Sequence, residues 1–143
     1  MTDNKKAVRD FSLSLRAFGE QIPATALAVQ QDLAMKGLIR VVNKSPVDTG
    51  RFRGNWQAQT TASDPAPIAR FDKAPRGSGP SAAVQAAAEA VIAGAKPYGT
   101  IYIVNGLPYA QRLEDGYSQQ APGGMVALTL AELQAEVQGA AAP

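Results

Sequence analysis

The chain carries a distinctive turn sequence between its helical and strand-like parts, Ser45-Pro46-Val47-Asp48-Thr49-Gly50-Arg51. Aspartate, threonine and glycine in succession favour an Asx-type turn in which the glycine takes a positive φ. A helical pattern precedes this sequence, and a composition typical of a strand follows it. We therefore expect residues 45–51 to join a long helix to a sheet.

Two amphipathic helices are expected before this turn. In residues 8–22, and again from 23 to 41, apolar residues recur at steps of three and four, which places them on one face of an α-helix. Pro23 separates the two helices, because proline is best tolerated in the first turn of a helix. Asn43 and Pro46 are typical stop signals.

A strand, a loop and a third helix are expected next. Residues 52–61 are rich in aromatic residues, threonine and glutamine, which favours a strand. Residues 62–80 are rich in proline and glycine and predict a long, exposed and flexible loop. Residues 80–93 are rich in alanine and predict a helix that Gly94 ends.

The clearest strand of the chain covers residues 100–106 and ends in an Asn105-Gly106 turn signal. A short helical turn over residues 109–113, ending at Gly116, a loop over 119–124 and a helix over 125–138 complete the pattern. We expect one α+β domain over residues 1–143. It would contain N-terminal helices, a small antiparallel β-sheet with an inserted alanine-rich helix and a long loop, and a C-terminal helix.

The composition excludes several kinds of site. The 143 residues include no cysteine and no histidine, which rules out disulfides, nucleophiles paired with histidine, and ordinary zinc sites. The formal net charge of +2 permits contact with phosphate but is small for a dedicated nucleic-acid binder. We expect no cofactor and no metal.

The apolar residues favour association and do not indicate a membrane segment. No apolar run approaches the roughly 20 residues that cross a bilayer, and the first residues lead into an amphipathic pattern instead of a signal peptide. Hydrophobic residues make up 45% of the chain but aromatic residues only 6%. Because alanine supplies little area for a core, we expect contact with other subunits and none with a membrane.

The triplet Asp48-Thr49-Gly50 has a second interpretation, because retroviral-type aspartic proteases carry it at their active site. In those homodimers each chain lends one aspartate, and the pair shares a proton. Here a helical pattern and Pro46 lead into the triplet instead of a hydrophobic strand. Arg51 follows, and its charge favours full ionisation of Asp48. We favour the turn and keep a protease homodimer as an alternative function.

The sequence Leu113-Glu114-Asp115-Gly116 offers two carboxylates for a metal or for acid–base chemistry. Neighbouring residues point to different sides, and no histidine can complete such a site. A helix end with Glu114 in an ion pair to Arg51 or Arg53 is the favoured interpretation.

The aromatic and basic residues each have two interpretations. Aromatic residues at strand spacing are more often core than base-stacking groups, and we expect core positions for Trp56, Tyr98, Tyr102 and Tyr109. The basic residues are either solvated charges or contacts to DNA phosphates inside a ring, and a small DNA-binding protein is a further alternative. The possible DNA contacts are Arg53, Arg70, Lys73 and Arg76.

Four short motifs in a fixed order resemble one protein family. They are Ser45 to Trp56 (SPVDTGRFRGNW), Ile103 to Ala110 (IVNGLPYA), Leu113 to Ser118 (LEDGYS) and Gln120 to Val126 (QAPGGMV). Together they resemble the neck and tail-completion proteins of long-tailed bacteriophages, a family that includes HK-type tail components and proteins similar to the minor tail protein Z of phage lambda. The resemblance covers roughly residues 24–138.

The resemblance implies a non-enzymatic structural subunit of the virion at the head–tail interface, assembled in the cytoplasm of a bacterial host. It implies a homo-oligomeric ring that meets head-closure or adaptor proteins and the tail terminator or tail tube, with double-stranded DNA possible in the lumen. The residues expected at the subunit interface or in its structural motif are Asp48, Thr49, Gly50, Arg51, Trp56, Asn105, Tyr109, Glu114, Gly116, Pro122 and Gly124.

Overall fold

The computed structural model describes residues 23–141, and the helix expected over residues 8–22 lies outside this range. Within it, helices combine with a small antiparallel sheet, which confirms the expected α+β class. The elements in chain order are α2 (Pro23–Lys44), α3 (Arg51–Gly54), β1 (Trp56–Gln59), α4 (Ala82–Ala93), β2 (Tyr102–Asn105), α5 (Ala110–Glu114) and α6 (Val126–Ala141).

The two strands pair in antiparallel orientation, with Trp56 opposite Asn105. Directly opposite residues in such a pair lie on the same face. Trp56, Ala58 and Ile103 therefore share one face, and all three are buried. Tyr102 lies on the other face and is only half-buried, so the expectation that it belongs to the core is wrong.

The strand expected from residue 52 begins only at Trp56, because residues 51–54 form the helical turn α3. Gly50 adopts a φ of 86°, and its carbonyl oxygen accepts the N–H of Gly54 at 3.0 Å. This hydrogen bond closes the turn. The composition of residues 52–61 favours a strand. It gives no information on the hydrogen bond between Gly54 and Gly50, which forms because Gly50 adopts a left-handed conformation.

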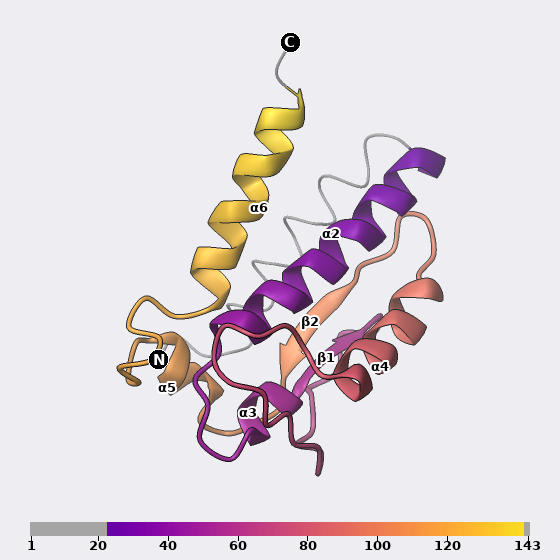
Figure 1. The fold of residues 1–143 in the computed structure, drawn as a ribbon. Helices are drawn as coiled ribbons and strands as arrows, with labels where there is room; N and C mark the ends of the chain where they lie inside the picture. The colour runs from indigo at the N-terminus through magenta and orange to yellow at the C-terminus, as the bar shows by residue number, and fades with distance from the viewer. Residues whose placement is uncertain (1–22, 142–143) are drawn as a thin grey trace.

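Helix α2 is the central element, because it contacts both strands, α4 and α6. Figure 1 shows α4 and α6 on either side of it. Its inner face includes Leu38, Val41 and Val42, which are almost completely buried, as the apolar spacing predicts. The buried residues of α4 are Val84, Ala88 and Ile92.

Residues 62–80 contain no helix or strand, as expected. Helix α4 starts after them with Ser81 as its N-cap, whose hydroxyl oxygen accepts the N–H of Val84 at 3.4 Å. Serine is a favoured N-cap because it satisfies one of the free N–H groups of the first turn. Part of this loop is bound to α3 and β1 by side-chain hydrogen bonds, which are described below.

The chain after β2 follows the predicted order. The short helix α5 ends before Gly116, which adopts a φ of 88°. A loop leads from there to α6, which starts at Val126 and extends beyond the expected residue 138. None of the helices in residues 23–141 is long and apolar enough to cross a membrane.

Candidate functional site

Several loops meet where α2 ends, at the bottom of the molecule in Figure 1. We call this region the loop end and define it as residues 45–55, 68–81, 105–109 and 114–125. Two hydrogen bonds join its distant parts: the N–H of Val47 donates to Oε1 of Gln120 at 2.9 Å, and Nε2 of Gln120 donates to the carbonyl oxygen of Val47 at 3.0 Å. The loop end contains most of the residues that the sequence singled out.

The turn at residues 48–50 forms as expected, but with a different side chain. The hydroxyl oxygen of Thr49 accepts the N–H of Arg51 at 3.2 Å, so the turn is closed by threonine and not by Asp48. Asp48 and Thr49 are exposed. Helix α2 leads into this turn, whereas a β-strand leads into the triplet of the retroviral-type proteases.

Two glycines, Gly50 just before α3 and Gly54 at its end, bring a distant segment into backbone contact. We call this segment, residues 68–75, the strap. A Cβ atom on Gly54 would lie 2.1 Å from the carbonyl oxygen of Arg70, and one on Gly50 would lie 2.3 Å from that of Asp72. Only glycine permits such an approach. The sequence analysis missed this contact, although the four-residue spacing of Gly50 and Gly54 is a signal that could have indicated it.

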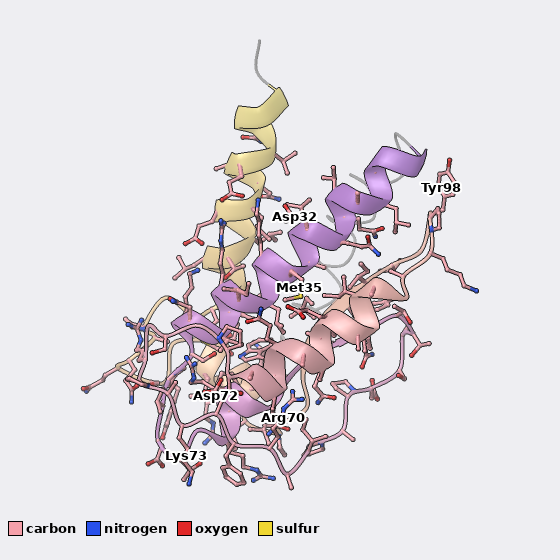
Figure 2. The ribbon with its side chains drawn as sticks, turned by 45° about the vertical axis from the view of Figure 1, so that its right-hand side comes forward. Asp32, Met35, Arg70, Asp72, Lys73 and Tyr98 are labelled. Atoms are coloured by element: carbon pink, nitrogen blue, oxygen red, sulfur yellow. The ribbon has the colours of Figure 1, made fainter. Side chains whose placement is uncertain are left out.

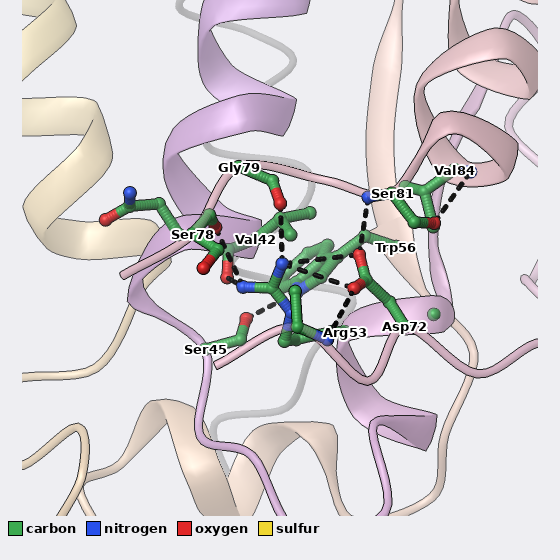
Figure 3. A network of polar contacts seen from close by, with 12 residues as sticks. Val42, Ser45, Arg53, Trp56, Asp72, Ser78, Gly79, Ser81 and Val84 are labelled. Carbon is green, nitrogen blue, oxygen red and sulfur yellow. Dashed lines mark hydrogen bonds and ion pairs between the residues drawn. The ribbon is translucent and has the colours of Figure 1, made fainter. Parts of the chain in front are cut away.

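A buried ion pair fixes the strap and the residues after it (Figure 3). Nη2 of Arg53 lies 3.3 Å from both carboxylate oxygens of Asp72, and both side chains are fully buried. Nη2 also donates to the carbonyl oxygen of Gly79 at 2.7 Å. Nη1 donates to the carbonyl oxygens of Val42 and Ser78 at 3.0 and 2.9 Å. Arg53 is therefore a structural residue, and its predicted contact with DNA is wrong.

The carboxylate of Asp72 accepts further hydrogen bonds from backbone N–H groups. It accepts the N–H of Ser81 at 2.7 Å and that of Ala74 at 3.2 Å. A buried carboxylate needs such partners, because burial removes its hydration. The ion pair thus connects α2, α3, the strap and the start of α4.

Two buried asparagines hold further backbone groups at the loop end. Nδ2 of Asn55 donates to the carbonyl oxygen of Ile68 at 3.1 Å, and its Oδ1 accepts the N–H of Ile68 at 2.8 Å. Asn105 donates to the carbonyl oxygen of Phe52 at 2.9 Å and accepts the N–H of Leu107 at 3.1 Å. Asn105, expected at the interface or in its motif, thus acts inside the fold.

Trp56 also lies inside the fold, with 1% of its surface exposed. Its indole N–H donates to the hydroxyl of Ser45 at 2.8 Å, and its ring meets that of Phe52 edge to face at 5.6 Å. The predicted core position of Trp56 is confirmed. Those of Tyr98 and Tyr109 are wrong, because 56% and 39% of their surfaces are exposed.

Glu114 binds the start of α6 and not an arginine, so the predicted ion pair with Arg51 or Arg53 is wrong. Its carboxylate accepts the N–H groups of Met125, Val126 and Ala127 at 2.9, 2.8 and 3.1 Å. The first N–H groups of a helix lack partners within the helix, and its positive end favours an anion. Glu114 therefore anchors α6 to α5.

Gly116 and Gly124 make this anchor possible. Both have a positive φ, of 88° and 79°. A Cβ on Gly116 would lie 2.5 Å from the carbonyl oxygen of Pro122, and one on Gly124 would lie 2.4 Å from that of Glu114. The structure thus brings together Glu114, Gly116, Pro122 and Gly124, four residues that the sequence analysis placed in the interface motif.

The basic residues of the loop end differ in their accessibility. Arg70 is half-buried, and its guanidinium donates to the carbonyl oxygens of Gly54 and Trp56 at 2.7 and 2.8 Å. Burial lowers the pKa of Arg70 from its ordinary value, although nearby Asp72 opposes that change. Lys73 and Arg76 are exposed. Of the four predicted DNA contacts, these two remain accessible.

An open depression of about 430 Å³ lies on this end, lined by Asp48, Thr49, Phe71 and Lys73. Within residues 23–141, no group of three or more acidic, cysteine or histidine side chains is placed to hold a metal ion. Comparisons of the chain with family models, with curated proteins and with solved structures found no significant match.

Proposed function

We propose that this chain is a structural subunit of a long-tailed bacteriophage virion, which associates into a ring at the head–tail junction. The observation that carries the proposal is the loop end, where fixed loops present exposed aromatic side chains. Phe71, Tyr109 and Tyr117 are 50%, 39% and 73% exposed. Loops held by a rigid scaffold often carry binding function, and aromatic residues are enriched in protein interfaces.

The four motifs of the phage resemblance support the same proposal, because they meet at this end. The first and fourth are joined by the pair of hydrogen bonds between Val47 and Gln120. The first and second are joined by the bond from Asn105 to Phe52. The third and fourth are joined by Glu114 at the start of α6. Motifs far apart in sequence thus build one surface.

The proposed partners are identical subunits, head-closure or adaptor proteins, and the tail terminator or tail tube. Where DNA passes through the ring, Arg51, Lys73 and Arg76 are the exposed basic residues of the loop end that could contact phosphate. The buried Arg53 and the backbone-bound Arg70 are not part of that set.

The test measures both assembly and location. The mass of the purified full chain is determined by light scattering over a range of concentrations, and particles are examined by negative-stain electron microscopy. Antibodies against the chain are then used for gold labelling of virions. We expect a ring-sized oligomer and gold at the neck. A chain that stays monomeric throughout and is absent from virions would contradict the proposal.

A further inference from the structure

Helix α6 has one principal neighbour in the part of the chain that the structure describes. It packs extensively against α2 and against no other helix or strand of residues 23–141. Its inward stripe is nevertheless apolar, with Leu130, Leu133 and Val137 at steps of three and four residues. Leu133 is buried, whereas Leu130 and Val137 are only half-buried. The apolar stripe is therefore wider than the surface that α2 covers.

Helix α2 carries a matching half-buried residue near its start. Val29 lies two turns before Lys36 on the same face of the helix, and Lys36 lies 3.7 Å from the carboxylate of Glu136 in α6. This face of α2 is thus turned toward α6, and Val29 is half-buried on it. The two helices are close at their lower ends and diverge toward the top (Figure 1 and Figure 2). Apolar side chains therefore stay partly uncovered on both helices where these separate.

The residues before α2 have the length and the pattern to cover these side chains. Residues 1–22 precede Pro23, which begins α2 at its upper end. Within them, apolar residues at positions 8, 11, 15, 18 and 22 recur at helical steps and include two of the four phenylalanines. A helix over residues 8–22 would be about 22 Å long, and the 16 residues of α6 span about 24 Å. The lengths of the two helices match.

The charges of the segment and its connection to α2 favour packing within one chain. Arg9, Arg16 and Glu20 lie on the side of such a helix opposite its apolar residues, so they stay in water when the apolar side is covered. A neighbouring copy carries the same segment. The direct connection at Pro23, however, keeps the chain's own segment at a high effective concentration beside α6.

We propose that residues 8–22 fold back as a helix between the diverging ends of α2 and α6 and cover the half-buried stripe. Because the segment enters α2 at its upper end, Phe18 would lie near Val137, and Phe11 would lie further down, near Leu130. Three helices would then enclose the apolar faces that two leave partly open. This packing is separate from the loop end, so it stands or fails independently of ring formation.

Cross-linking of the full chain tests which residues lie together. The chain contains no cysteine, so an introduced pair supplies the only thiols. The double variant Phe18→Cys with Val137→Cys is treated with a short bismaleimide at low protein concentration, and the products are identified on denaturing gels and by peptide mass spectrometry. We expect a rapid link within one chain. Arg16→Cys with Val137→Cys is the matched control and should link about tenfold more slowly, because the two sides of a helix are about 10 Å apart.

Cleavage by trypsin after Arg16 measures how well the segment is held, since a packed helix resists proteolysis. We expect Leu130→Glu and Val137→Glu each to raise the cleavage rate about tenfold, because an unpaired charge is not buried against an apolar helix. Ala131→Glu, at an exposed residue of α6, adds the same charge outside the stripe and should leave the rate unchanged. Thermal unfolding of each variant confirms that it is folded.

Three results would each overturn the proposal. Equal rates of linking from Phe18→Cys and Arg16→Cys would show that the apolar side of the segment does not face α6. Links that form only between two chains would assign the cover to a neighbouring copy. Cleavage after Arg16 that is as fast in the unmodified chain as in Val137→Glu would show that the stripe does not hold the segment.

Discussion

Gly54 shows how a single missing side chain shapes the loop end. The space that its Cβ would occupy is filled by the carbonyl group of Arg70. We expect Gly54→Ala to destabilise the protein by about 2 kcal/mol, because backbone atoms must move to relieve the overlap. Urea unfolding measures this change. Gly79→Ala, in the loop that follows the strap and with open space at its Cβ, should unfold nearly as the wild type does.

Arg53 and Asp72 illustrate the cost of breaking a buried pair. We expect Asp72→Asn to cost about 3 kcal/mol of unfolding free energy, because it leaves a buried guanidinium without its counter-charge. Adding Arg53→Met should recover part of that loss, since the uncompensated charge is then removed. Chemical unfolding of both single variants and the double variant gives the coupling between the two residues. Strictly additive losses would disprove the coupling.

At the level of elements, α6 depends on a residue outside itself. Glu114→Ala removes the acceptor of three N–H groups at its start, and we expect a loss of about 2 kcal/mol. Glu114→Gln keeps a neutral acceptor and should lose about 1 kcal/mol. Thermal unfolding followed by circular dichroism measures both. Asp115→Asn, at the exposed neighbouring residue, should change stability by less than about 0.5 kcal/mol.

Helices α2 and α6 are also joined by charges on their surfaces. Lys36 and Arg40 pair with Glu136, and Lys44 pairs with Glu132. The hydrogen bond from Arg40 lowers the pKa of Glu136 below its ordinary value of 4.5. A lowered folded-state pKa stabilises the fold above that ordinary value, and the stabilisation disappears as pH falls through the folded-state pKa.

This linkage predicts a pH-dependent difference between the wild type and Glu136→Gln. At neutral pH the wild type should have the slightly higher melting temperature, and the difference should vanish in acid. High salt should reduce it too, because exposed pairs are screened. Melting curves at several pH values test this, with Glu89→Gln, which removes an exposed carboxylate from α4, as a control for the loss of one negative charge. A difference that persists at low pH would contradict the assignment to Glu136.

Periodic patterns predicted α2 and α6, because burial of one face leaves a regular trace in the sequence. Composition predicted α4, which is rich in alanine, and β2, which ends in an Asn-Gly turn signal. The turn α3 and the strap left no such trace. Their conformations depend on backbone contacts of Gly50 and Gly54 with residues 70–72, which the local sequence does not encode. Glu114 was correctly singled out but given the wrong partner, since the N–H groups that it binds belong to the later helix α6.

For the whole molecule, most residues that the sequence singled out lie at the loop end, but the sequence did not show which of them are exposed. Trp56 and Asn105 were predicted for the interface or its motif and Arg53 for a contact with DNA, and the structure buries all three. Phe71 and Tyr117 were not among the predicted site residues, because no pattern in the neighbouring sequence indicates that a single aromatic residue is exposed. Their exposure follows only from how the loops are fixed around them.

Tyr117 provides the sharpest test of whether the loop end makes the contacts between subunits. It is the most exposed large hydrophobic residue of residues 23–141, and the Arg112 guanidinium lies 5.2 Å from its ring centre. Because such an aromatic side chain gains most of its burial only on association, we expect Tyr117→Ala to weaken self-association by about 2 kcal/mol and to leave the melting temperature of the monomer unchanged. Sedimentation velocity over a concentration series measures the association.

Tyr98→Ala is the matched control, since Tyr98 is also exposed but projects from the opposite end of the molecule (Figure 2). Equal weakening by both substitutions, or by neither, would place the subunit contact elsewhere.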